Sequence, residues 1–319
     1  MCGASPQTEP AETADRKTFS VPKSRFKSRS KTTSKKLIAY QGEPGANSDL
    51  ACRKAYPDYT PLPCATFEDA FAAVRSGRAA LGMIPIENSV AGRVADIHYL
   101  MPHSKLHIVA EYFLPVHHQL MAPKAASLKT LKTVESHIHA LGQCRKEIRT
   151  LGLKAVVASD TAGSARQVAE AGDVTRASIA TALAAKIYGL KVLRKNIEDE
   201  SHNTTRFVVL SRRPKWAPPP KSRRDKVVTT FIFEVRNIPA ALYKALGGFA
   251  TNGINMTKLE SYMVGGTFTA TQFYADVEAH PKERALALAL EELDFVAQPK
   301  SVKILGVYPA HKARAKLTG

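Results

Sequence analysis

The stretch Asn203–Asp225 reads NTTRFVVL and then SRRPKWAPPPKSRRD, and it divides the chain in two. The apolar run at 206–210 predicts a strand that completes one folded unit. The segment that follows combines four prolines with charged side chains, and such a segment continues neither a helix nor a central strand. We therefore predict an interdomain linker at 213–225, between one domain at 37–212 and a second at 226–310.

Short apolar runs alternate with helical patterns before the linker. The expected strands lie at 37–40, 80–86, 155–158 and 206–210, and the clearest helices lie at 67–75 and 162–171. This alternation is typical of an α/β domain. After the linker the pattern predicts strand 227–235, helix 239–251, strand 254–263, strand 267–277, helix 281–293 and strand 301–308. That order is the βαββαβ pattern of ferredoxin-like folds.

The ends of the chain are basic. The 319 residues carry a formal net charge of +18, and residues 1–36 hold nine Lys/Arg against three Asp/Glu without any periodicity. We predict a disordered basic tail at 1–36 and a second basic tail at 311–319. Because aromatic residues are not interleaved with the basic runs, no nucleic-acid partner is expected, and small anionic substrates explain the charge equally well.

Membrane, metal and cofactor signals are missing from the sequence. No apolar run reaches the length of a membrane span and no signal peptide is recognised, so no membrane partner and a cytoplasmic location are expected. The four cysteines contain no CxxC pair, and neither His117-His118 nor His137-Ile138-His139 has further residues at metal-ligand spacing. No phosphate or dinucleotide fingerprint is present. We predict neither a metal nor a cofactor.

Three strand-to-helix junctions of the first domain carry small polar residues, at 41–48, 87–89 and 159–161. The first turn of a helix has free N–H groups that favour an anion, and converging junctions would hold a small acid with several charges. A single junction of this kind is more often only a helix cap. The segment 203–207 differs, because Thr205 and Arg206 place a hydroxyl and a guanidinium at the start of a strand, and such groups can donate a proton and grip a carboxylate.

Several segments in fixed order resemble the prephenate dehydratases that carry a fused ACT domain. The matching segments are 38–46 (IAYQGEPGA), 85–89 (PIENS), 135–144 (ESHIHALGQC), 160–162 (DTA), 184–190 (AAKIYGL) and 205–207 (TRF). The resemblance covers about residues 37–310. It implies an α/β dehydratase domain of two lobes, like a type II periplasmic binding protein, with the substrate in the cleft between them and a ferredoxin-like ACT domain behind.

The resemblance also implies an activity and a site. The enzyme would be a carbon–oxygen lyase that decarboxylates and dehydrates prephenate to phenylpyruvate, or arogenate to phenylalanine, without a cofactor. Thr205 would be the catalytic hydroxyl and Arg206 would help to bind the charge of the substrate. By the same resemblance, Asn88, Ser136 and Gln143 would be further catalytic residues, and Glu87, Ser89, Thr161 and Phe207 would bind the substrate.

The second domain resembles ACT modules, which bind amino acids at dimer interfaces. L-phenylalanine is then the expected effector and a homodimer or homotetramer the expected assembly. The effector residues carried over are Asn237, Ala240, Ala241, Leu242, Glu260 and Ser261. Residues 240–243 read AALY and residues 260–263 read ESYM, where the family usually has GALV and ESRP. The lost Gly and Arg leave the sign and the strength of regulation open.

Two other classes of function remain open on the residues alone. The two-lobed domain could capture a small acid without catalysis and relay that signal through the second domain. The net charge and the tail would suit a protein that associates with RNA or an anionic surface.

Overall fold

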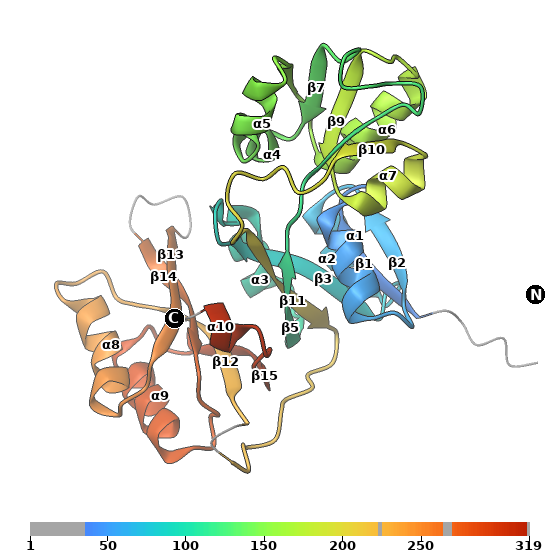
Figure 1. Ribbon diagram of the computed structural model, residues 1–319. Coiled ribbons are helices and arrows are strands. Elements are labelled where there is room, and N and C mark those ends of the chain that lie inside the picture. The colour runs from blue at the N-terminus through green and yellow to red at the C-terminus, as the bar shows by residue number, and fades with distance from the viewer. Residues whose placement is uncertain (1–35, 223–224, 264–269, 318–319) are drawn as a thin grey trace, which may run out of the picture. The chain divides into compact units, whose positions relative to one another are not determined.

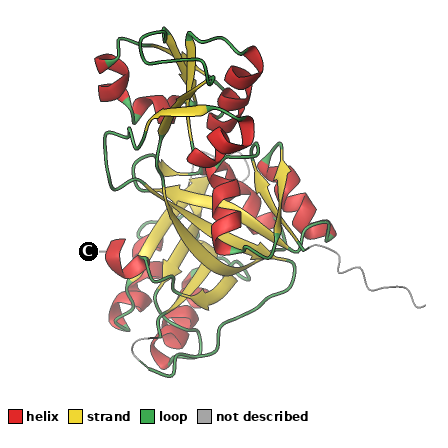
Figure 2. Ribbon diagram, turned by 45° about the vertical axis from the view of Figure 1, so that its right-hand side comes forward, coloured by secondary structure: helices red, strands yellow, loops and turns green. Residues whose placement is uncertain are grey.

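The structure of the protein is a computed structural model that describes residues 36–222, 225–263 and 270–317. Of the predicted tail at 1–36, residues 1–35 lie outside these ranges, and so do Gly265 and Gly266, for which the sequence predicts a hairpin turn between the strands at 254–263 and 267–277. The described strands form two sheets, one of ten strands and one of five (Figure 1). Helices pack on both sheets (Figure 2). No helix in the described ranges is both long enough and apolar enough to cross a membrane.

The first lobe is built on one half of the larger sheet. Its strands are β1 (Leu37–Gln41), β2 (Thr60–Cys64), β3 (Leu81–Asn88), β4 (Gly92–Arg93), β5 (His107–Pro115) and β11 (Thr204–Ser211), and its helices are α1 (Asn47–Ala55), α2 (Phe67–Ser76) and α3 (Ala95–His103). β1 pairs in parallel with β2 and β3, whereas β11 lies antiparallel between β3 and β5. β11 therefore returns from the second lobe to the centre of this sheet.

The second lobe is built on the five-stranded sheet, in the order β10-β6-β9-β7-β8. Its elements are β6 (Gln119–Ala122), β7 (Thr133–Ser136), α4 (Ile138–Gly142), α5 (Arg145–Thr150), β8 (Lys154–Val157), α6 (Thr161–Ala171), β9 (Arg176–Ala180), α7 (Ala182–Tyr188) and β10 (Lys191–Arg194). The chain crosses between the lobes twice, after β5 and before β11. The expected two-lobed α/β fold is confirmed.

The two lobes contact each other at Gly45, where no side chain could be accommodated. The backbone of Gly45, with φ +91°, lies against α7, and a Cβ at this position would meet Ala184 at 2.7 Å. The Thr181 hydroxyl donates to the Gly45 carbonyl at 2.5 Å, and the Tyr188 hydroxyl donates to the carbonyl of Pro44 at 2.8 Å. Only glycine permits both this φ and this close approach.

The part after the linker has the predicted βαββαβ order. Its elements are β12 (Val227–Glu234), α8 (Ala241–Thr251), β13 (Met256–Met263), β14 (Ala270–Val277), α9 (Arg284–Val296) and β15 (Lys303–Pro309), with the strands in the order β13-β14-β12-β15. Stacked rings of Phe231, Phe233 and Phe249 form the centre of its core. The ferredoxin-like topology is confirmed.

The two parts share one continuous sheet, which the linker in the sequence did not suggest. β15 pairs in parallel with β5 at Gly306 and Ile108, and a side chain at Gly306 would collide with the carbonyl of Ile108. The segment from residue 311, interpreted above as a basic tail, docks there too. Arg314, at the start of α10 (Arg314–Leu317), is 5% exposed and donates to both carboxylate oxygens of Glu111. That interpretation is wrong for this arginine because a buried carboxylate needs a partner.

Arg206 lies at the centre of this junction and is 3% exposed. Its Nε donates to Glu111 at 2.9 Å, its Nη1 to Asp276 at 2.6 Å and to Glu87 at 2.8 Å, and its Nη2 to the Tyr308 hydroxyl at 3.1 Å. Burial alone would lower the pKa of Arg206, but Asp276, Tyr308 and Glu111 together raise the pKa well above its usual value. The arginine therefore stays charged and joins β3, β5 and β11 to β14 and β15.

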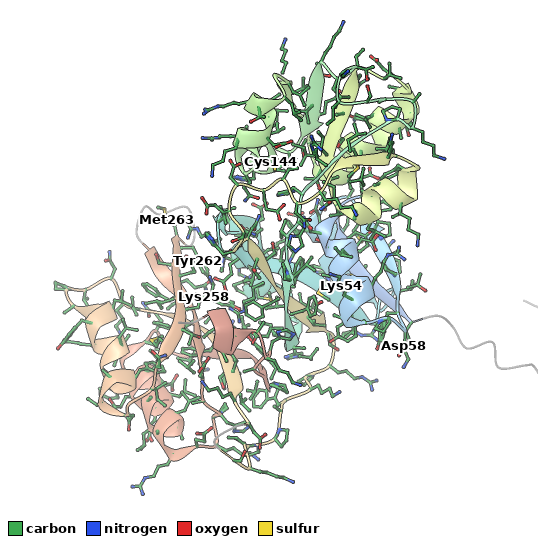
Figure 3. The ribbon with its side chains drawn as sticks, viewed as in Figure 1. Lys54, Asp58, Cys144, Lys258, Tyr262 and Met263 are labelled. Carbon is green, nitrogen blue, oxygen red and sulfur yellow. The ribbon has the colours of Figure 1, made fainter. Side chains whose placement is uncertain are left out.

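His98 of α3 packs against the second part without a hydrogen-bond partner. Its ring lies 5.2 Å from that of Tyr274 and 5.8 Å from that of Tyr262, which is on β13 (Figure 3). Both ring nitrogens are buried and unpaired among the described residues. Burial first, and then the nearby Lys258, lowers the pKa of His98 from 6.5 to about 4.

Removal of Arg206 is predicted to destabilise the fold strongly. Arg206→Met leaves Asp276 buried beside a neutral side chain and Glu111 with Arg314 as its remaining arginine, and breaking a buried ion pair costs about 3–5 kcal/mol. The free energy of unfolding from denaturant titration measures the loss. Lys226→Met removes the exposed pair with Glu278 and is the control, expected to cost less than about 1 kcal/mol. Equal losses in the two variants would contradict the central role of Arg206.

The free energy of unfolding is predicted to fall below pH 6.5 because His98 is buried in its neutral form. The unfolded chain binds a proton at this histidine near pH 6.5, whereas the folded protein resists protonation down to about pH 4. The contribution of His98 is thus complete above pH 6.5 and is lost as the pH falls towards 4, by about 3 kcal/mol at most. In His98→Phe, the denaturation midpoint should depend less steeply on pH over this range. An unchanged slope in the variant would show that other groups titrate.

Candidate functional site

A chain of side-chain amides holds the hydroxyl of Thr205, at the point where β11 leaves the second lobe. The Asn88 amide Nδ2, at the end of β3, donates to Thr205 Oγ1 at 3.0 Å and to Asn203 Oδ1 at 2.7 Å. The amide of Asn203 donates to Gln143 Oε1 at 2.6 Å. Thr205 Oγ1 is thus an acceptor from Asn88, which leaves its own O–H free to donate to another group.

Gln143 connects this chain to the second lobe. Its Oε1 also accepts from His118 Nε2 at 2.9 Å, so both acceptor positions of the carbonyl are occupied. Burial lowers the pKa of His118 below 6.5, against the opposing contact with Gln143, and the ring is therefore neutral with its proton on Nε2. The Gln143 amide NH2 has no bond to a described residue and is available as a donor.

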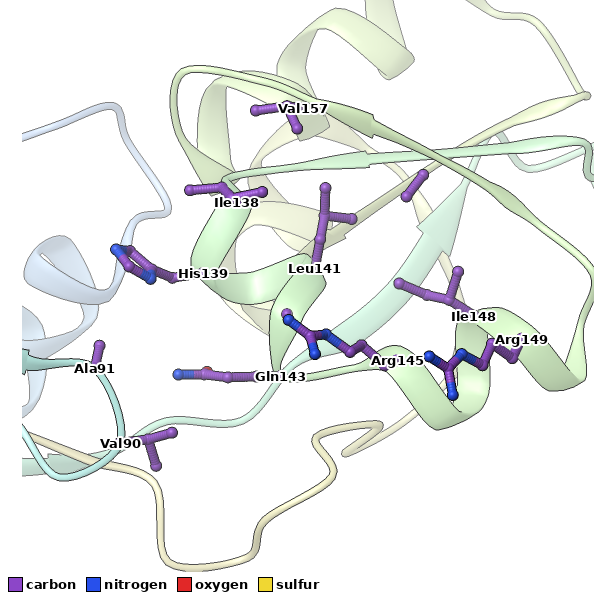
Figure 4. Close-up of a pocket in the computed structure, with 12 residues that line it drawn as sticks. Val90, Ala91, Ile138, His139, Leu141, Gln143, Arg145, Ile148, Arg149 and Val157 are labelled. Atoms are coloured by element: carbon purple, nitrogen blue, oxygen red, sulfur yellow. The ribbon is translucent and has the colours of Figure 1, made fainter.

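A cavity of about 480 Å³ adjoins these residues between α4, α5, β8 and the turn after β3 (Figure 4). The residues that line it are mostly apolar, together with four polar side chains: Val90, Ala91, Ile138, His139, Leu141, Gly142, Gln143, Arg145, Ile148, Arg149, Ala155 and Val157. Asn88 reaches its rim directly, because Asn88 Oδ1 accepts from the backbone N–H of Val90 at 3.0 Å and of Ala91 at 2.8 Å. Its size is in the range of small-molecule sites.

The three polar junctions expected from the sequence do not all meet. A second cavity of about 440 Å³ is lined by residues 41–44 of the first junction and by Ser159 and Asp160 of the third. Asp160 caps α6 as predicted, accepting from Gly163 N at 2.7 Å, with Thr161 as the first helical residue. The second junction is no helix start, because Glu87 and Asn88 lie inside β3, which turns into β4.

Several expected site residues have other partners. The Ser136 hydroxyl is buried and donates to the Ile179 carbonyl, and Phe207 is 1% exposed in the core of the first lobe. The hydroxyl of Ser89 bonds to the backbone of residues 202 and 204 and so supports the loop before Thr205. Every nitrogen of the Arg206 guanidinium is engaged in the junction described above, with Glu87 as one partner. None of these side chains is among the residues that line the cavity, and each instead contributes to the fold around it.

A third cavity, of about 370 Å³, lies at the start of α8. It is lined by Val235, Arg236, Asn237, Ile238, Ala240, Ala241, Leu242, Tyr243, Ser261 and Phe273. Five of the six expected effector residues are therefore brought together, although they come from segments twenty residues apart. Glu260 points elsewhere and pairs with Lys258 at 3.1 Å.

Two ion-pair routes lead from this region to β3. Lys258 bridges Glu260 to Glu87 at 2.7 Å, while Arg93 of β4 donates to Glu260 at 3.4 Å and to the Ser261 carbonyl at 3.2 Å. β4 pairs with Glu87 and Asn88. The pKa of Glu87 is lowered because Arg206 and Lys258 outweigh the effect of burial.

Sequence reasoning missed Asn203 and His118. Asn203 stands beside the Thr205 motif and could have been included for its amide, but nothing in the sequence indicates that it reaches Gln143, sixty positions away. His118 belongs to the His117-His118 pair, whose sequence pattern bears only on a metal site and not on a bond to Gln143. Among the described residues, no group of three His, Cys, Asp or Glu lies close enough to hold a metal ion.

Comparison with known proteins identifies relatives along most of the chain. A bifunctional N-acyl-homoserine lactone acylase/prephenate dehydratase from Komagataeibacter europaeus is 52% identical over 88% of this chain and 98% of its own length. The chloroplastic arogenate dehydratase/prephenate dehydratase 1 of Arabidopsis thaliana is 37% identical over 88% of this chain and 74% of its own. A solved prephenate dehydratase from Arthrobacter aurescens, in complex with L-Phe, is 28% identical, with a TM-score of 0.78 over 86% of this chain and 92% of that one.

The family model of prephenate dehydratase matches residues 38–215 and thus ends where the linker begins. The match includes the amide chain that holds Thr205 and the cavity beside it. It covers more than half of the 319 residues. This chain therefore belongs to the prephenate dehydratase family.

Proposed function

We propose that the protein converts prephenate to phenylpyruvate, and that Thr205 donates the proton in this reaction. The observation that carries the proposal is the bond from Asn88 to Thr205 Oγ1, which directs the hydroxyl proton of Thr205 away from Asn88. Family membership supports the reaction class, and the adjoining cavity supports a small-molecule substrate. Arogenate, which has an amino group in place of the side-chain keto group, is the alternative substrate and would give phenylalanine.

The chemistry suits a site of hydroxyls and amides. The ring carboxylate leaves as carbon dioxide, its bonding electrons complete the aromatic ring, and the C–O bond to the 4-hydroxyl breaks. The departing hydroxide takes a proton from Thr205 and leaves as water. Donation by Asn88 stabilises the negative charge that develops on Thr205 Oγ1, until a proton from solvent restores the hydroxyl. Help from a positioned acid is worth roughly 10²–10⁴-fold in rate.

A second activity is proposed on one observation. The relative from Komagataeibacter europaeus, 52% identical, is named as both an N-acyl-homoserine lactone acylase and a prephenate dehydratase. We propose that this chain also hydrolyses N-acyl-homoserine lactones, giving a fatty acid and homoserine lactone with consumption of one water. The apolar walls of the 480 Å³ cavity suit an acyl chain.

For regulation, we propose that the second part is an ACT domain and that L-phenylalanine binds in the 370 Å³ cavity at α8. The residues around this cavity support the assignment, since five of the six positions expected from the ACT resemblance line it. Ser261 lines the cavity and also accepts from Arg93, and β4, which carries Arg93, pairs with the strand that carries Asn88. Phenylalanine bound here would act on Asn88 through these contacts. It can do so only if it binds two conformations of the protein with different affinities.

The activity is tested by product identification with Thr205 variants. Wild-type protein incubated with prephenate should yield phenylpyruvate, and with arogenate phenylalanine, and the faster conversion identifies the substrate. Thr205→Val should lower kcat at least a hundredfold because it keeps the shape and removes the hydroxyl, whereas Thr205→Ser should retain much of it. Wild-type protein without either product would refute the dehydratase.

The second activity is tested in parallel by the release of fatty acid from an N-acyl-homoserine lactone. If no fatty acid is released, the acylase proposal alone is refuted.

Arg93→Gln is predicted to uncouple phenylalanine from turnover. The variant loses the contacts to Glu260 and Ser261, so calorimetry should still detect phenylalanine, while the effect of phenylalanine on kcat should shrink at least threefold. Lys226→Gln, which removes an exposed pair in the same part of the chain, is the control and should respond like wild type. A full response in Arg93→Gln would exclude this route, and no heat with wild-type protein would exclude the effector.

A further inference from the structure

The proposed substrate carries two carboxylates, and the arginine expected to bind one of them is occupied elsewhere. Arg206 gives all its guanidinium nitrogens to Glu87, Glu111, Asp276 and Tyr308. A dianion that enters an apolar cleft without a cation partner would lose much of its hydration uncompensated. Another positive group must therefore lie close to the amide chain around Thr205.

The cavity beside Gln143 contains two such groups on α5. Arg145 and Arg149 are four residues apart and therefore lie on the same face of this helix, one turn from each other. Both line the cavity, and the close-up shows both side chains among its apolar residues (Figure 4). A methyl group placed on Gly142 would be 3.7 Å from Nη2 of Arg145, so this guanidinium lies over the residue next to Gln143.

Both guanidinium groups are free to bind a ligand. Neither has a hydrogen bond or an ion pair with any residue in the described ranges, although the same helix carries Glu147, which pairs with Arg194 at 3.5 Å. The helix itself is held in place: Asp199 accepts from the backbone N–H of Arg145 at 3.0 Å and of Lys146 at 3.2 Å, and Ile148 is buried. The two charges are thus presented on a fixed backbone.

The rest of the cavity suits the remainder of the substrate. Ile138, Leu141 and Val157 provide an apolar wall for a six-membered ring, and the free amide NH2 of Gln143 is a donor on the side of the cavity that leads to Asn88 and Thr205. A ligand with a ring and a carboxylate would place its anionic group on the arginines and turn its other end towards the amide chain.

We propose that Arg145 and Arg149 bind a carboxylate of the substrate and are substrate-binding residues of this enzyme. The inference rests on the proposed dehydratase function and deepens it, because it identifies the cations that Arg206 does not supply. Arginine suits the task, since its planar guanidinium can grip both oxygens of a carboxylate. The ring packs against the apolar wall, and the hydroxyl that leaves faces Thr205.

The test compares single and double substitutions with a neighbour on the same helix. Arg145→Gln and Arg149→Gln should each raise KM for the faster substrate about tenfold, and the double variant more, while kcat changes less than about threefold. Lys146→Gln removes one positive charge from the same helix without touching the cavity, and its KM should stay within twofold of wild type. Arg→Lys at either position should restore part of the affinity.

Binding is measured separately by calorimetry with prephenate, with the arginine and lysine substitutions placed in the slow Thr205→Val variant, so that heat of reaction does not mask heat of binding. Weaker binding in the arginine variants than in Lys146→Gln, at an unchanged denaturation midpoint, supports it. An unchanged KM and Kd in the double variant would overturn it, and so would an equal loss in Lys146→Gln, which would indicate only general attraction by positive charge. A wild-type protein that binds prephenate through these arginines but forms no product would refute the dehydratase and leave the binding site standing.

Discussion

The buried guanidinium of Arg206 is the interaction on which the arrangement of this protein depends. Glu111 and Asp276 are almost fully buried, one on β5 of the first lobe and one on β14 of the second part. Carboxylates in such surroundings are tolerated only when they are paired and hydrogen-bonded. Arg206 bonds to both, and with Arg314 on Glu111 it balances these charges where the two parts share one sheet across β5 and β15.

The same strand serves the site and the junction because its side chains alternate. Successive residues of a strand point to opposite faces, so Thr205 meets Asn88 at the cleft end while Arg206 turns to the carboxylates of the junction. Any shift of the second part that moves Asp276 or Tyr308 therefore acts on the neighbour of the proposed catalytic residue. The part after the linker and the proposed site therefore contact adjacent residues of the same strand.

The ion pairs between β13 and β3 add a second connection. Lys258, Glu87 and Arg93 link β13, whose Ser261 lines the cavity at α8, to β3, which carries Asn88. The prolines between the two parts suggest separable units in the sequence. In the folded protein, however, the two parts share one sheet through β5 and β15.

The sequence by itself determined the elements and the family. Apolar periodicity predicted the strands at 37–40 and 206–210, the helices at 67–75 and 162–171 and the βαββαβ order, because burial of one face depends only on local spacing. The short motifs identified Thr205, Asn88 and Gln143, which the structure joins through Asn203. Tertiary structure alone decided what Arg206 binds, that Ser136 and Phe207 are buried, that Arg314 docks on Glu111, and that Arg145 and Arg149 line the cavity beside Gln143. These contacts join residues that are far apart in the chain. A local sequence pattern cannot predict them, because it does not determine which distant strands pack together.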